Sequence, residues 1–341
     1  AKPKVEVVFC LDTTGSMGGL IEGAKQKIWA ISNQIVSGAP VPDLKIGLVG
    51  YRDKGDAYVT KVFDLSDDLD AIHGHLKKFQ AAGGGDGPES VNKALYDAVH
   101  KIKWSKDATT LKIIFLVGDA QPHMDYKEVK YPETCQEAVK KNIIINTIQC
   151  GRNSAATKFW TDISKKAEGE YVAIAQNGGV VAVATPFDKK LAELNSKLAK
   201  STIGYGSVRA RRAIADKAEE AAKLDAPAAA SRAGASAKRG KGVGGDLVDD
   251  LKSKKVKLKD LDENKLPEKL RAMKPAQRKQ YIEKVSKERA TINKEIIDLD
   301  RKRSDFIKKE LAKKKLNGKN GFDSKVLEML RKQAKKHNIK Y

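Results

Sequence analysis

Two kinds of apolar run alternate along the first 180 residues. Continuous runs of β-branched and aromatic residues, such as Val5–Leu11, predict strands that are buried on both faces. Runs with apolar positions three and four residues apart, such as Gly18–Ser37, predict amphipathic helices. The further predicted strands are 44–51, 58–63, 111–117, 143–150 and 170–174, and the further helices are 67–79, 89–103, 134–141 and 155–167. This order predicts an α/β fold with a doubly wound, mostly parallel six-stranded sheet that binds ligands at the carboxyl ends of its strands.

In the second half of the chain, the spacing of apolar residues predicts helices, and we assign no strands there. We divide the sequence into a first domain at 1–180, docking helices at 181–225 and a flexible linker at 226–246, which is rich in Ala, Gly and Ser. A basic α-helical extension follows at 247–341, with one long helix at about 275–315. Because the apolar residues of that helix follow 3-4 spacing, we expect it to pair with another helix, including that of a second copy of the chain, or to lie along a surface.

The net charge of +22 is unevenly distributed. Residues 1–180 contain 23 Lys and Arg against 22 Asp and Glu, whereas residues 181–341 contain 43 against 22. Three interpretations of this excess compete: a solvated helical surface comes first, an anionic cell-envelope polymer or membrane surface second, and nucleic acid third. Aromatic residues are sparse in this half and it has no recognised binding motif, which disfavours nucleic acid. The charge is therefore a separate question from the function of the first domain.

Other features narrow the class of protein. No run approaches the 18 to 20 apolar residues of a membrane span. The sequence begins with Ala1, so we expect either a trimmed N-terminus or the removal of a signal peptide. Cys10, Cys135 and Cys150 are too few for a disulfide scaffold and lack zinc-type spacing. We expect buried thiols, although the sequence leaves a bond between Cys135 and Cys150 open.

Candidate chemistry gathers where predicted strands end. The first strand ends in D-x-T-x-S, so Asp12, Thr14 and Ser16 can turn one carboxylate and two hydroxyls toward the same point. These hard oxygen donors suit Mg²⁺, Mn²⁺ or Ca²⁺. Alternatively, Thr14 or Ser16 only caps the next helix. Asp119 follows the strand at 111–117, and the glycine-dense loop at 83–89 is expected at or beside the same edge of the sheet.

In this order and spacing, the three features resemble a von Willebrand factor type A domain over residues 4–176. That family has a Rossmann-like fold and a metal-ion-dependent adhesion site. Its site uses D-x-S/T-x-S, a residue of the loop between the second and third helices, and an Asp after the fourth strand. The resemblance implies a divalent cation, with Mg²⁺ first and Mn²⁺ or Ca²⁺ as alternatives. The implied ligands are Asp12, Thr14, Ser16 and Asp119.

The glycine-dense loop departs from the family pattern. The family usually has Thr at this position, and this chain has Asp86 before Pro88. As a ligand, Asp86 would tighten cation binding and reduce the pull of the cation on an incoming carboxylate. Alternatively, Asp86 caps the following helix; we favour a role as a ligand or beside one. The residues expected to form a partner-binding rim are Gly15, Met17, Glu89 and His123.

The resemblance implies a metal-dependent protein-binding or adhesion protein that is not an enzyme. A partner protein would supply an Asp or Glu carboxylate to the cation, and no nucleophile with its base lies nearby. His123 is the best candidate for a chemical residue, and a hydrolase that uses Asp86, Glu89 and His123 is the least favoured interpretation.

The main alternative is an adaptor subunit of an ATP-driven, AAA+-type assembly, as some intracellular members of the family are. The full chain resembles bacterial members with a basic helical extension, many of which are exported. We therefore favour a periplasmic or secreted location over a cytoplasmic one.

Overall fold

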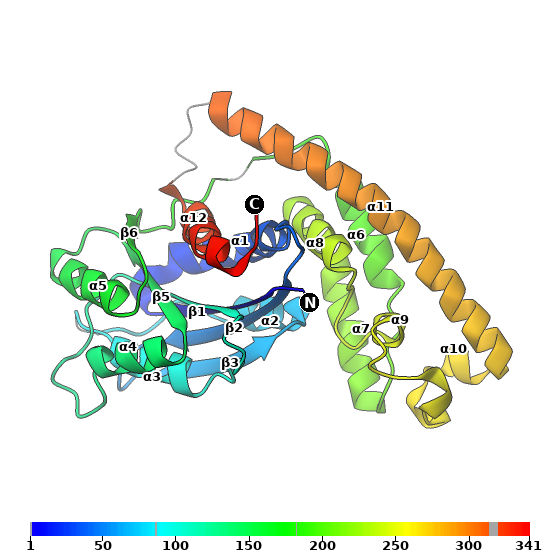
Figure 1. The fold of residues 1–341 in the computed structure, drawn as a ribbon, viewed down its shortest axis with the longest axis horizontal. Coiled ribbons are helices and arrows are strands. Elements are labelled where there is room, and N and C mark those ends of the chain that lie inside the picture. The colour runs from blue at the N-terminus through cyan, green and yellow to red at the C-terminus, as the bar shows by residue number, and fades with distance from the viewer. Residues whose placement is uncertain (1, 86, 182, 314–319) are drawn as a thin grey trace. The chain divides into compact units, whose positions relative to one another are not determined.

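The computed structural model describes residues 2–85, 87–181, 183–313 and 320–341 (Figure 1). The chain divides into unit 1, formed by Ala1–Ala182 and Lys315–Tyr341, and unit 2, formed by Val183–Lys314. Unit 2 is therefore an insertion in the sequence of unit 1. None of the described helices combines the length and the apolar character needed to cross a membrane.

Unit 1 is built on a six-stranded sheet in the order β3-β2-β1-β4-β5-β6. All neighbouring strands are parallel except β3, which is antiparallel to β2. The central strands are buried at almost every position, which explains their continuous apolar runs. The fold class predicted from the sequence is thus confirmed. The strands are β1 (Lys4–Asp12), β2 (Asp43–Tyr51), β3 (Thr60–Ser66), β4 (Leu111–Gly118), β5 (Ile143–Cys150) and β6 (Tyr171–Ile174).

Helices cover both faces of the sheet (Figure 1). Val8 and Cys10 of β1 pack into a core with the helices α3, α4 and α5. On the opposite face, Phe9 lies against Phe322, with ring centroids 6.0 Å apart, and α12 packs beside α1. Cys10, Cys135 and Cys150 are buried thiols, as expected. The helices are α1 (Gly18–Ile35), α2 (Leu69–Lys77), α3 (Val91–His100), α4 (Tyr131–Lys140), α5 (Ser154–Lys166) and α12 (Phe322–Ala334).

The assignment of residues up to 341 to a basic extension is wrong at the C-terminus. The chain returns after unit 2, and α12 completes the layer that covers β1 and β4. Phe322 and Leu330 are almost fully buried there. Asn146 of β5 and Gln333 exchange two side-chain hydrogen bonds of 3.0 and 2.8 Å. The last residues belong to unit 1 because their apolar side chains fill its core.

Replacing Gln333 with leucine should lower the free energy of unfolding of unit 1 by about 1–3 kcal/mol, because it leaves the buried Nδ2 donor of Asn146 without its partner. Urea unfolding followed by tryptophan fluorescence measures this, since all three tryptophans lie in unit 1. Gln136→Leu, at an exposed position of α4, is the control and should change stability by less than about 0.5 kcal/mol. Equal effects of the two variants would contradict the role of the Asn146–Gln333 pair.

Unit 2 is helical throughout its described part. Its core joins α6, α8 and α11 in one apolar cluster, and α9, α10 and the first half of α11 in another. The helices predicted within 181–225 therefore belong to unit 2, and their docking on the first domain stays a prediction. The helices are α6 (Asp188–Lys200), α7 (Val208–Ala222), α8 (Ala226–Arg239), α9 (Leu247–Lys252), α10 (Glu268–Arg271) and α11 (Pro275–Lys313).

The prediction of a flexible linker at 226–246 is also wrong. Asp225 caps α8 by accepting from the Ala228 backbone N–H, and Gly240 ends the helix in the left-handed region at φ 63°. The small side chains of α8 are buried against α6 and α11. Alanine is the best helix former, and small residues allow close helix packing, so a composition typical of linkers here forms the centre of a bundle.

Helix α11 corresponds to the long helix predicted from Pro275. Its apolar positions pack inside unit 2: Ile296 lies in the cluster with α6 and α8, and Ile282 and Val285 lie in the other cluster. These positions are therefore occupied inside unit 2, and a homo-oligomer through this helix stays a prediction. Residues 314 and 315, at the predicted end of the helix, lie outside the described residues.

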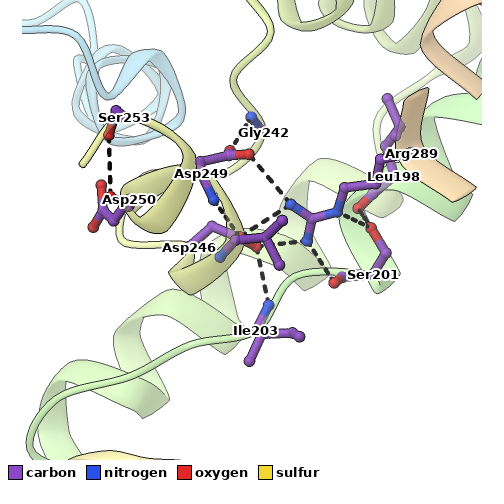
Figure 2. A network of polar contacts seen from close by, with 10 residues as sticks. Leu198, Ser201, Ile203, Gly242, Asp246, Asp249, Asp250, Ser253 and Arg289 are labelled. Carbon is purple, nitrogen blue, oxygen red and sulfur yellow. Dashed lines mark hydrogen bonds and ion pairs between the residues drawn. The ribbon is translucent and has the colours of Figure 1, made fainter. Parts of the chain in front are cut away.

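A buried ion pair connects three segments of unit 2 (Figure 2). The Arg289 guanidinium donates to both carboxylate oxygens of Asp246, at 3.0 and 2.7 Å. It also donates to Oγ and the backbone carbonyl of Ser201, at 2.8 and 2.6 Å. Asp246 in turn accepts from the backbone N–H groups of Val248 and Ile203. One charge pair therefore joins α11 to the start of α9 and to the segment after α6.

Candidate functional site

The loop after β1 is organised by the side chain of Asp12. Asp12 is the last residue of β1 and is fully buried. Its Oδ1 accepts from the backbone N–H of Thr14 at 2.8 Å and from Thr14 Oγ1 at 2.6 Å. Thr14 Oγ1 lies 3.5 Å from Ser16 Oγ, and α1 begins shortly afterwards at Gly18. The D-x-T-x-S motif thus gathers its three oxygen-bearing side chains, as the sequence predicts.

The second carboxylate oxygen of Asp12, Oδ2, is buried and accepts no hydrogen bond from the described residues. Burial raises the pKa of Asp12 to about 7 against the lowering effect of the Thr14 hydrogen bonds, and the negative charge of Asp119 raises it further. A Cβ atom on Gly118 would lie 3.1 Å from this oxygen, so only glycine at the end of β4 leaves room beside it. A buried, unpaired carboxylate oxygen is costly unless a cation faces it.

Asp119 approaches the same loop from the end of β4. Its Oδ2 accepts from Gln176 Nε2 at 2.7 Å, and the same amide nitrogen lies 3.3 Å from the Ser16 carbonyl. Asn153 Nδ2 donates to the Asp119 backbone carbonyl at 3.2 Å. Sequence reasoning missed Gln176, although it follows β6 at the carboxyl edge of the sheet, where the strand-end rule looks for polar side chains.

Glu89 lies inside the site and not on its rim. A Cβ atom on Gly84 would be 2.8 Å from Glu89 Oε1 and 3.0 Å from Thr14 Cβ, so both side chains border the same glycine. Glu89 is buried, and its Oε2 has no hydrogen-bond partner in the described part of the chain. Burial, followed by the charges of nearby aspartates, Asp12 first, raises its pKa to about 9. Asp86, the favoured loop ligand, lies outside the described residues.

Backbone pairing explains the position of Glu89. Its N–H donates to the Gln121 carbonyl at 2.9 Å, and the His123 N–H donates to the Glu89 carbonyl at 3.2 Å. A short parallel bridge between Glu89 and Pro122 therefore holds the glycine-dense loop against the segment that follows Asp119. This long-range pairing leaves no signal in the local sequence pattern.

The predicted rim differs from the structure in other ways. Gly15 and Ser16 are exposed, but Met17 is fully buried and is therefore not a rim residue in this conformation. His123 is also buried: its ring stacks on Tyr126 with centroids 3.9 Å apart. His123 Nδ1 lies 2.9 Å from Asp125 Oδ1. His123 therefore packs within the fold and is not exposed to an approaching partner.

Two further aspartates, Asp53 and Asp56, hold the loops around Glu89 through hydrogen bonds. Asp53 accepts from Ser90 Oγ and Tyr126 Oη, both at 2.7 Å, and its Oδ2 lies 3.3 Å from His123 Nε2. Asp56 accepts from the N–H groups of Asp53 and Gly84. These aspartates are already hydrogen-bonded, so they position the loops that surround Glu89.

The donor set fits a hard divalent cation. It combines carboxylates (Asp12, Asp119, Glu89) with hydroxyls (Thr14, Ser16), and two of the carboxylate oxygens are buried without partners among the described residues. Within residues 2–85, 87–181, 183–313 and 320–341, no group of three or more His, Cys, Asp and Glu side chains is arranged to hold a metal. A cation here would therefore depend on the hydroxyls as well as the carboxylates.

Several known proteins are similar to this chain. Alpha-protein kinase vwkA of Dictyostelium discoideum is 28% identical over 120 residues, which is 35% of this chain and 19% of that protein. The human von Willebrand factor A domain-containing protein 7 is 35% identical over 120 residues, or 35% of this chain and 12% of that protein. The chain thus spans less than a fifth of the length of either relative.

Among solved structures, proximal thread matrix protein 1 from the mussel byssus, with a zinc-occupied MIDAS motif, is 16% identical. The match covers 52% of this chain and 43% of that one, with a TM-score of 0.39, and carries no argument about function. The sequence profile of the von Willebrand factor A domain matches residues 6–186. Because this match covers more than half of the 341 residues, the chain belongs to the von Willebrand factor A domain family.

Proposed function

We propose that this protein binds a partner protein through a divalent cation, Mg²⁺ first, held at the loop after β1, and that it is not an enzyme. The observation that carries the proposal is Asp12 Oδ2, a fully buried carboxylate oxygen without a partner among the described residues. It lies next to Asp119 and in the loop that contains Thr14 and Ser16. Membership in the family agrees with a role in protein binding.

Each residue has a defined part in this proposal. Asp12 and Asp119 supply negative charge from the ends of adjacent strands, and Thr14 and Ser16 supply hydroxyl oxygens. Thr14 also orients Asp12 by donating two hydrogen bonds to Oδ1. A bound cation would offer an electrophilic position to a carboxylate of the partner. Gly15 and Ser16 are exposed, so a partner has access to the loop.

From the sequence, we expected Asp86 to supply the additional negative charge of the site. In the structure, Glu89 is a further carboxylate beside Thr14. Without metal, the raised pKa keeps Glu89 protonated at neutral pH. A bound cation would favour its ionised form, and the site would then hold three negative charges against the two positive charges of the cation. This favours cation binding and weakens the attraction for an acidic partner. We therefore propose that Glu89 raises the affinity for the cation and lowers the affinity for an acidic partner.

Glu89→Gln should lower the affinity for Mn²⁺ about tenfold, because it removes one anionic ligand candidate without changing side-chain size. Its stability without metal should stay within about 0.5 kcal/mol of wild type, since the raised pKa keeps Glu89 protonated at neutral pH. Calorimetric titration and urea unfolding give the two values. Unchanged Mn²⁺ affinity would exclude Glu89 from the site.

The partner function is tested with peptides. An array of short peptides with a single Asp or Glu is compared with the same peptides carrying Asn or Gln, in Mg²⁺ and in chelator. The proposal predicts retention of the protein by some acidic peptides in Mg²⁺ alone. Retention that is equal on the amide peptides, or that persists in chelator, would contradict it. The adaptor alternative gains no support from the comparisons.

A further inference from the structure

Unit 2 contains a cavity of about 380 Å³ that is unrelated to the loop after β1. It lies between α7, the segment after α6 and the start of α10. Part of its lining is apolar, from Ile214, Ala215 and Ala218 of α7. The remaining polar lining includes the charged side chains of Arg211, Glu268 and Arg271. The volume lies at the lower end of the range of small-molecule sites, so a macromolecular segment is not the expected occupant.

Arg211 is held in place without using its charge. Its Nη1 donates to the backbone carbonyls of Gly206 and Asn264, at 2.6 and 2.9 Å. Among the described residues, no carboxylate lies within 4 Å of its guanidinium nitrogens. The guanidinium is therefore anchored by neutral groups, and among the described residues no carboxylate pairs with it. Arginine fixed in this way is well suited to carboxylate or phosphate, which its planar fork matches.

Arg271 supplies a second positive charge to the same cavity. In the described part of the chain its side chain makes neither a hydrogen bond nor an ion pair, although Glu268 lines the cavity too. Both guanidinium groups line one cavity, and neither has a carboxylate partner among the described residues, so an anion in the cavity would be attracted by both. Unit 2 has 35 Lys and Arg against 20 Asp and Glu, so its field also attracts anions.

We propose that this cavity binds a small oxyanion ligand, with a carboxylate or phosphate group placed between Arg211 and Arg271. The apolar side chains of Ile214, Ala215 and Ala218 would contact the body of the ligand. Glu268 would accept a hydrogen bond from a hydroxyl or ammonium group of the same molecule, which favours a ligand with a donor near its anionic group. The proposal is independent of the cation site in unit 1.

The test is calorimetric titration of the full chain in metal-free, low-salt buffer with two probes, inorganic phosphate and butyrate. Arg271→Gln should weaken binding of the better probe about tenfold or more, because it removes a charge-assisted contact. Among the described residues the Arg271 side chain makes no hydrogen bond or ion pair, so its replacement removes no polar contact of the fold. Arg212→Gln, at an exposed position of α7 outside the cavity, is the control with the same change of charge and should bind as wild type.

Two further variants make the result specific. Ala218→Leu fills the cavity and should abolish binding of both probes, whereas Asp12→Asn in unit 1 should leave binding unchanged. Phosphate as the better probe would indicate a phosphorylated ligand, and butyrate a carboxylate ligand. Equal loss in Arg271→Gln and Arg212→Gln would mean attraction to the general charge of unit 2 and would overturn the proposal. Absence of binding by both probes to the wild-type protein would overturn it too.

Discussion

Replacing Arg289 with alanine is expected to lower the free energy of unfolding of unit 2 by about 3–5 kcal/mol. The change removes the bidentate pair with Asp246 and leaves that carboxylate, 1% exposed, as an uncompensated buried charge. It also removes the two contacts with Ser201 (Figure 2). The loss should be large because α11 loses its polar contacts with Asp246 and with Ser201 at the same time.

The unfolding of the two units can be followed separately. The three tryptophans report on unit 1 only, whereas circular dichroism at helical wavelengths reports on both units. Arg289→Ala should shift a urea transition seen by circular dichroism and leave the fluorescence transition in place. Arg301→Ala, at an exposed position of the same helix, should change stability by less than about 0.5 kcal/mol. Equal shifts for the two arginine variants would contradict the role given to the ion pair.

Asp12→Asn should have two effects of opposite sign. Without metal, it should raise the free energy of unfolding of unit 1 by about 1–3 kcal/mol, because it replaces a buried unpaired charge with a neutral group of the same shape. The asparagine Oδ1 can still accept the two hydrogen bonds from Thr14. The same change should reduce divalent-cation affinity by roughly 100-fold or more, since even residues behind the ligands change affinity 10- to 100-fold.

This pair of effects separates a cation site from a merely strained carboxylate. Urea unfolding with and without Mg²⁺ should show that Mg²⁺ stabilises the wild-type protein and not the variant. Asp43→Asn, at an exposed position, is the control and should keep the wild-type response to Mg²⁺. A variant that is stabilised by Mg²⁺ as strongly as the wild type would show that Asp12 is not part of a cation site.

Strand ends were predictable from the sequence, and with them the positions of two aspartates of the candidate site. Asp12 and Asp119 each follow a continuous apolar run, and parallel strands bring such ends to one edge of the sheet. Glu89 was expected on the rim, and the structure buries it. Its position depends on the bridge to Pro122, a contact across more than thirty residues that the local sequence does not reveal. Gln176 was missed because β6 is short and its last residues carry little pattern.

The errors in the second half have other physical reasons. The linker prediction gave weight to Ala, Gly and Ser content and overlooked a complete set of helix boundary signals, Asp225 before Pro227 and Gly240 after Arg239. The place of α12 in unit 1 was not predictable from local periodicity, because its apolar face fits a sheet more than 130 residues earlier in the chain. Local patterns predict elements, and tertiary packing decides their partners.

The central claim is that the loop after β1 holds a divalent cation. It is tested most directly by calorimetric titration of Mg²⁺, and separately Mn²⁺, into the metal-free wild-type protein and into Asp12→Asn. The account predicts saturable binding that depends on Asp12 in the wild type, and an affinity lower by roughly 100-fold or more in the variant. Wild-type protein that binds neither cation, or a variant that binds both as the wild type does, would contradict it.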